Sequence, residues 1–133
     1  MRHLATRLAL AGTAALATVA LPGATPAEAT PFACSSIFSS DGLAATVCTM
    51  IMNGQVNGRL NPLQPGVTVD SLTLYKCNAA ETSCTTLAQT TALMTPNFTA
   101  VAGKHYETCA HIHIQETPTV TRYYSGCSPF AVA

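Results

Sequence analysis

Apolar and polar positions alternate with a period of two along most of the chain after residue 30, and no segment keeps the helical period of 3.6. The clearest alternation runs from His105 to Gln115, where every second residue from Tyr106 to Ile114 falls on one face. Further strands are expected over residues 32–38, 44–52, 67–77, 83–90, 97–102 and 120–127. The apolar phase slips between Val69 and Leu72, which predicts a β-bulge near Asp70-Ser71.

About seven short strands separated by turn signals are typical of an all-β fold, and predict a small antiparallel β-sandwich. The segment 53–66 carries two Asn-Gly pairs and two prolines, so we expect an exposed loop there. Within that loop Asn57, Arg59 and Asn61 are candidates for binding contacts. Met50, Met52 and Met94 are expected to fill the core.

The first 29 residues have the organisation of a secretory signal peptide. A basic start precedes the apolar run 8–21, and Ala27-Glu28-Ala29 is a small-x-small cleavage pattern. Cleavage after Ala29 would leave one domain, residues 30–133, in a secreted, extracellular protein. An N-terminal anchor helix is the alternative, although no second apolar run long enough to span a membrane follows. The Ala- and Thr-rich leader is typical of bacteria.

All six cysteines follow this leader, as in disulfide-stabilised secreted domains. Cys109 and Cys127 are equidistant from Pro118, so a hairpin turning there would set them opposite each other. The same reasoning pairs Cys34 with Cys48 and Cys77 with Cys84. The rival is a Cys48–Cys109 bridge between the sheets, but Cys109 lies on the face opposite Tyr106 and Ile112, which disfavours it.

The stretch from Asn97 to Tyr106, which leads into an alternating strand, resembles the E–F corner of fibronectin type III and immunoglobulin-like domains. That resemblance implies a β-sandwich in which Tyr106 is the corner tyrosine. The chain departs from the pattern because it has no tryptophan and because Tyr106 stands three residues before Cys109. The resemblance implies an architecture and no particular activity.

Charge is sparse and nearly balanced in residues 30–133, with four cations against five carboxylates: Arg59, Lys76, Lys104 and Arg122 against Asp41, Asp70, Glu81, Glu107 and Glu116. No basic stripe is present to follow a phosphate backbone, so nucleic acid is not an expected partner. Glu107 and Glu116 are too far apart along one strand for a glycosidase pair, and are expected to be solvated. There is no Gly-x-Ser-x-Gly motif either.

His111 and His113 are the one suggestive pair, because residues i and i+2 of a strand share a face about 6–7 Å apart. They are weak candidates for a zinc or copper site, since a third ligand is not evident. A solvent-facing polar row is the favoured interpretation, and no cofactor is expected.

These observations favour a secreted, non-catalytic binding module, with an extracellular protein or a cell-envelope ligand as its partner. An inhibitor-like role, through the loops 54–65 or 78–83, belongs to the same class. A metal-binding protein that uses His111 and His113, or a structural cell-envelope protein, are the alternatives.

Overall fold

The computed structural model describes residues 29–133, so nearly all of the predicted signal peptide lies outside the described residues. The described chain forms nine strands. They are β1 (Phe32–Ser39), β2 (Gly42–Met52), β3 (Gln55–Pro62), β4 (Val67–Cys77), β5 (Cys84–Thr90), β6 (Phe98–Thr99), β7 (His105–Thr117), β8 (Val120–Cys127) and β9 (Ala131–Val132). Residues 29–133 contain no helix long and apolar enough to cross a membrane.

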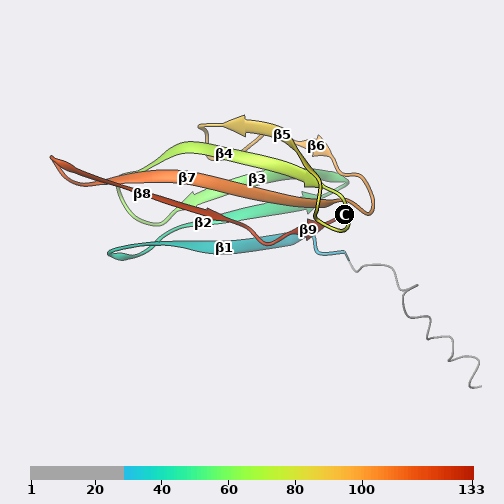
Figure 1. The fold of residues 1–133 in the computed structure, drawn as a ribbon, viewed down its shortest axis with the longest axis horizontal. Helices are drawn as coiled ribbons and strands as arrows, with labels where there is room; N and C mark the ends of the chain where they lie inside the picture. The colour runs from blue at the N-terminus through green and yellow to red at the C-terminus, as the bar shows by residue number, and fades with distance from the viewer. Residues whose placement is uncertain (1–28) are drawn as a thin grey trace, which may run out of the picture.

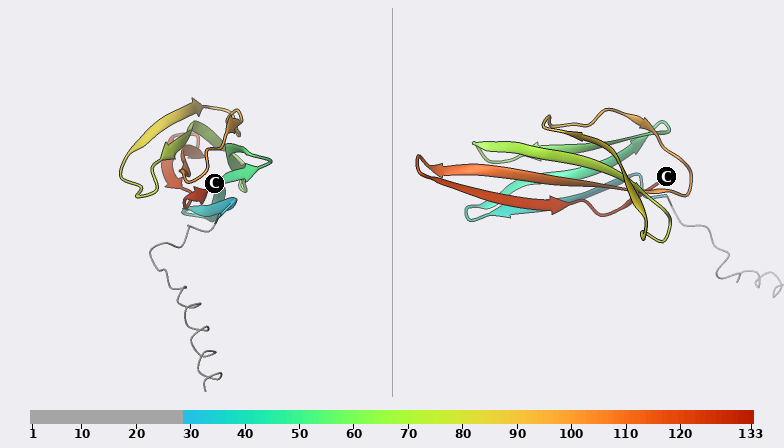
Figure 2. Two further views of the ribbon diagram at one scale, coloured as in Figure 1. Left: turned by 90° about the vertical axis from the view of Figure 1, so that its right-hand side faces the viewer. Right: turned by 45° about the horizontal axis from the view of Figure 1, so that its top comes forward.

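The strands form two antiparallel sheets, which confirms the predicted all-β architecture (Figure 1). Sheet I has the order β1-β2-β3-β6, and sheet II has the order β5-β4-β7-β8, with β9 also paired to β7. Figure 2 shows the two sheets curving around a shared interior, with the long strands running lengthwise through the molecule. The β1–β2 turn and the β7–β8 hairpin lie at the same end, and the C-terminus lies at the other.

The side chains of β7 alternate between the core and the outer face of sheet II, as the sequence predicts. Tyr106, Ala110 and Ile112 are fully buried, whereas His111 on the opposite face is exposed. The Tyr106 hydroxyl accepts a hydrogen bond from the backbone N–H of Val101 at 2.8 Å. The register of β4 shifts between Val69 and Ser71, which confirms the predicted bulge.

Three disulfides join Cys34 to Cys48, Cys77 to Cys84 and Cys109 to Cys127, the pairs that the hairpin geometry predicts. Each pair is also a register pair of two neighbouring strands. All three bridges therefore lie within a sheet, and none connects sheet I to sheet II.

The expectation of an exposed loop over 53–66 is wrong, because residues 55–62 form β3 in the interior of sheet I. Asn53 and Gly54 alone make the turn, with φ of 53° and 75°. Positive φ at both central residues is what a two-residue type I′ hairpin requires. The second Asn-Gly pair, Asn57-Gly58, lies inside the strand. The expected strand 97–102 is also shorter, since β6 spans only Phe98–Thr99.

Gly58 is needed in β3 because a buried side chain of sheet II presses against it. A Cβ at this position would lie 2.5 Å from Thr108 Oγ1 and 2.6 Å from Thr108 Cγ2. Thr108 is held there by hydroxyls: Thr49 Oγ1 lies 2.6 Å from Thr108 Oγ1 and 2.8 Å from Ser128 Oγ. All three hydroxyl residues are buried, so sheets I and II are joined by a polar cluster inside the apolar core.

Replacing Gly58 by alanine is expected to lower the free energy of unfolding by about 1–3 kcal/mol, because the added methyl overpacks the site against Thr108. Urea denaturation of the oxidised protein measures this loss. The double variant Gly58→Ala/Thr108→Ala is expected to lose less than the sum of the single variants, since the clash is then gone. The control Asn61→Ala, exposed on the same strand, should stay within about 0.5 kcal/mol of wild type. Strictly additive single effects would contradict the close approach.

Candidate functional site

Asn57 and Arg59, two of the three residues singled out as binding contacts, lie side by side on the outer face of sheet I. They alternate with Val56 and Leu60, which point into the core. Asn61 lies further along β3 as the register partner of Thr46, and is exposed. All three therefore lie on the outer face of one strand rather than on a loop, and Asn57 and Arg59, but not Asn61, line a common hollow.

Asn57 and Arg59 line a surface hollow of about 290 Å³, named here the Arg59 hollow. Its apolar walls are Met50 and Met52 from β2 and Met94 from the segment that follows β5. The remaining lining is amide side chains: Asn53, Gln55 and Asn97, in addition to Asn57. The hollow thus combines flexible thioether side chains, neutral hydrogen-bonding groups and one guanidinium.

Hydrogen bonds fix the polar side of the Arg59 hollow. Arg59 Nε donates to Asn57 Oδ1 at 3.0 Å, and Asn57 Nδ2 donates to Asn97 Oδ1 at 2.7 Å. Arg59 takes part in none of the three ion pairs that residues 29–133 form. Because only Nε is used in this chain of bonds, the two terminal nitrogens of Arg59 remain to bind an acceptor from outside.

The prediction that the methionines fill the core is wrong. Every methionine between residues 29 and 133 lines the Arg59 hollow, and Met52 and Met94 are 57% and 49% exposed. The sequence did carry a signal, since Met50 and Met52 lie an odd number of residues from Val47 and Thr49, which are buried, and so belong to the opposite face of β2. Met94 reaches the hollow because its segment pairs with β3 through an isolated bridge between Arg59 and Met94.

His111 and His113 share the outer face of sheet II, as the spacing predicts. His113 Nδ1 lies 2.7 Å from Asp70 Oδ1, and its ring lies 5.7 Å from the ring of Tyr123. Within residues 29–133, the one trio of possible metal ligands close enough to share an ion is Glu107, Cys109 and Cys127. Its two sulfurs are bonded to each other in a disulfide, and neither histidine belongs to it.

The loop Asn78–Ser83 is braced at both ends. Asn78 Oδ1 accepts hydrogen bonds from the backbone N–H groups of Thr82 and Ser83, at 2.9 and 3.2 Å, and the Cys77–Cys84 disulfide closes the loop. Glu81 contacts His105 Nδ1 at 2.8 Å. The acidic side chain of the loop is therefore held against β7.

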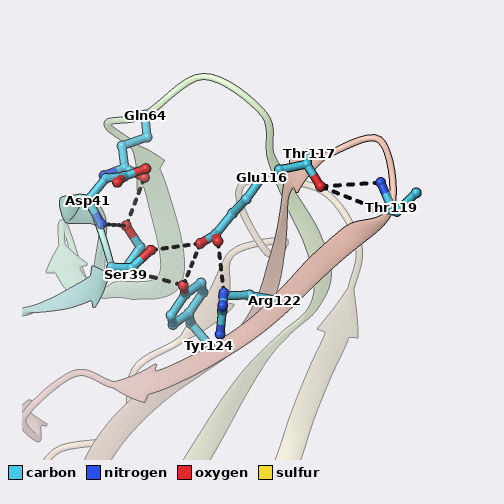
Figure 3. A network of polar contacts seen from close by, with 9 residues as sticks. Ser39, Asp41, Gln64, Glu116, Thr117, Thr119, Arg122 and Tyr124 are labelled. Carbon is cyan, nitrogen blue, oxygen red and sulfur yellow. Dashed lines mark hydrogen bonds and ion pairs between the residues drawn. The ribbon is translucent and has the colours of Figure 1, made fainter.

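The two glutamates of β7 differ, and the expectation that both are simply solvated is wrong. The Glu116 side chain, 19% exposed, faces Arg122, Tyr124 and the turn of Ser39 and Asp41 (Figure 3). Glu116 Oε1 accepts from Arg122 Nε at 2.8 Å, and Oε2 accepts from the hydroxyls of Ser40 and Tyr124 at 2.8 and 3.0 Å. These hydrogen bonds lower the pKa of Glu116, and the bond from Ser40 has the largest effect.

Glu107 shows the opposite effect. Its partial burial on the surface of sheet II raises the pKa of its carboxyl above the ordinary value, and the nearby charge of Glu81 adds to this. Glu116 therefore connects sheet I to the β7–β8 hairpin as an anion, whereas the carboxyl pKa of Glu107 is shifted in the opposite direction.

The chain matches no family model, no curated protein and no solved structure. The resemblance to fibronectin type III and immunoglobulin-like domains stays a prediction.

The lowered pKa of Glu116 predicts a pH-dependent contribution to stability. The contribution is complete above the ordinary value near 4.5 and is lost as the pH falls through the lower value of the folded state. In urea denaturation, wild type should therefore exceed Glu116→Gln in free energy of unfolding at pH 7, and the difference should shrink towards pH 3.

Glu107→Gln is the matched control, with the opposite sign. Because the pKa of Glu107 is raised in the folded state, ionising this group costs stability as the pH rises above 4.5. The stability of Glu107→Gln relative to wild type should therefore improve between pH 3 and pH 7. Parallel pH profiles for the two variants would refute the assigned environments.

Proposed function

We propose that this protein is a secreted, disulfide-stabilised, non-catalytic binding module that recognises an extracellular protein partner through the Arg59 hollow. The observation that carries the proposal is the Arg59 guanidinium, positioned by Asn57 but outside any ion pair of residues 29–133, among three methionines. Three disulfides in so small a domain are common in extracellular proteins, which supports export.

The lining of the hollow favours binding over catalysis. Amide side chains do not titrate, and a guanidinium stays protonated, so the polar lining supplies neither a general base nor an activated nucleophile. Thioether side chains are flexible and polarisable, and adapt to varied apolar partners. Arginine is among the residues that contribute most to binding energy at protein interfaces.

The charge and size of the hollow define the group it accepts. A guanidinium binds a carboxylate with two parallel N–H···O bonds, and a charge-assisted bond is about twice as strong as a neutral one. At about 290 Å³ the hollow lies at the lower limit of ligand sites, which suits one side chain of a partner. The partner would present a carboxylate next to an apolar group, such as an acidic residue beside leucine or a C-terminal leucine.

A fragment pair tests this proposal directly. N-acetyl-leucine carries a free carboxylate, and N-acetyl-leucinamide is its neutral counterpart. With ¹³C-methyl-methionine protein, N-acetyl-leucine should shift the signals of Met50, Met52 and Met94, with a Kd of about 1 mM. The neutral amide should bind at least tenfold more weakly, because it lacks the charge-assisted bonds to Arg59.

The variant Arg59→Gln should remove the difference between the two fragments. Lys104→Gln, which deletes a cation outside the hollow, is the control for net charge and should leave it intact. Equal binding of the acid and the amide to wild type, or shifts confined to residues outside the hollow, would overturn the proposal.

A further inference from the structure

Tyr123 presents an unusually open aromatic ring on the outer face of sheet II. Tyr123 belongs to the exposed large hydrophobic residues of the described range 29–133, and at 74% it is the most exposed of them. It borders a small hollow of about 140 Å³, whose polar lining is Asp70, His111 and Ser125. An accessible ring thus stands beside a recess with hydrogen-bonding groups.

Strand register explains why these groups meet. Tyr123 is the register partner of His113, and Ser125 is the register partner of His111, so all four share the outer face of the β7–β8 pair. Asp70 comes from β4, at the bulge between Val69 and Ser71. In a regular strand, side chains would alternate strictly between the two faces at this position. The bulge interrupts that alternation, and the Asp70 side chain contacts His113.

The recess is held in place by contacts that leave binding groups free. His113 Nδ1 lies 2.7 Å from Asp70 Oδ1, which leaves Oδ2 of the same carboxylate to accept other bonds. The ring of His113 packs against Tyr123 with centroids 5.7 Å apart and planes tilted by 52°. The Cys109–Cys127 disulfide ties β7 to β8 next to His111 and Ser125.

A second hollow, of about 610 Å³, also borders Tyr123 and is lined by Ser40, Thr121, Arg122 and Tyr124 as well. Arg122 and Tyr124 are held there by Glu116, as Figure 3 shows. Tyr123 therefore lines both hollows. A ligand longer than one ring could lie across Tyr123 and reach both.

We propose that this surface, named here the Tyr123 platform and composed of Asp70, His111, Tyr123 and Ser125, binds a saccharide chain. A pyranose ring has a face of C–H groups and a rim of hydroxyls. The C–H face packs on an aromatic side chain, whose face is electron-rich. The rim hydroxyls need both donors and acceptors, and a carboxylate, an imidazole and a hydroxyl provide both.

The Tyr123 platform lies on sheet II and the Arg59 hollow on sheet I, so the two proposals are tested separately. A saccharide is favoured over a protein partner here because Tyr123 is the one large exposed hydrophobic residue among those that line the small hollow. The polar groups Asp70, His111 and Ser125 also line the small hollow beside that ring.

Titration of the ¹⁵N-labelled, oxidised protein with chitotetraose, cellotetraose and maltotetraose tests the proposal. At least one of the three should shift the amides of residues 121–125 and 111–113 in a saturable way. Tyr123→Ala should weaken that binding at least tenfold, whereas Tyr123→Phe, which keeps the ring, should stay within about threefold. Asp70→Asn should also weaken binding, because it removes a charged acceptor.

Phe38→Ala is the matched control, since Phe38 is another exposed aromatic residue but lies on β1 of sheet I. It should bind like wild type. Failure of all three oligosaccharides to bind would overturn the proposal, as would binding that Tyr123→Ala leaves unchanged. Equal losses in Tyr123→Ala and Phe38→Ala would likewise refute a specific platform.

Discussion

The attachment of one sheet to the other depends on the packing of Thr108 against Gly58 and on the hydroxyl cluster of Thr49, Thr108 and Ser128. No disulfide crosses between the sheets, so this contact, the apolar core around it and the hydrogen bonds of Ser35 and Ser40 to sheet II hold the layers together without covalent help. A buried hydroxyl without a partner costs about 1–3 kcal/mol, so the three hydroxyls must be positioned together. The cluster therefore fixes the registration of sheet I on sheet II as well as their separation.

The disulfides have a different role, because each restrains neighbouring strands of one sheet. Cys48 is the register partner of Arg59 as well as of Cys34, and Cys109 lies two residues before His111. Two of the three bridges thus lie beside the two proposed binding surfaces. Cross-linking restricts the unfolded chain and stiffens the strands that carry these side chains. Rigid positioning reduces the entropy lost when a ligand binds, so under both proposals the disulfides would serve recognition as well as stability.

The sequence predicted the parts of the fold that depend on local alternation. The buried face of β7, the bulge near Asp70 and the three cysteine pairs follow from the period of two and from hairpin symmetry. The prediction of a loop in place of β3 was wrong, because Asn57-Gly58 has the composition of a turn. Gly58 is instead required by the close packing of Thr108, which lies 50 residues away in the chain. The Arg59 hollow could be predicted only in part for the same reason: Met94 and Asn97 reach it through tertiary pairing, which no local pattern records.

The two outer faces of the sandwich differ in chemistry, and the difference follows from which strands carry them. Sheet I presents thioethers, amides and an arginine, which suit an acidic, partly apolar protein surface. Sheet II presents a tyrosine with histidine, serine and aspartate, which suit the hydroxyls of a saccharide. Along each strand, core residues alternate with the residues of these outer surfaces. A shift of strand register by one residue would therefore turn core side chains outward and expose the interior. A domain with a partner on each face would link a protein to a glycan, a role that needs a rigid body between two sites and no catalysis.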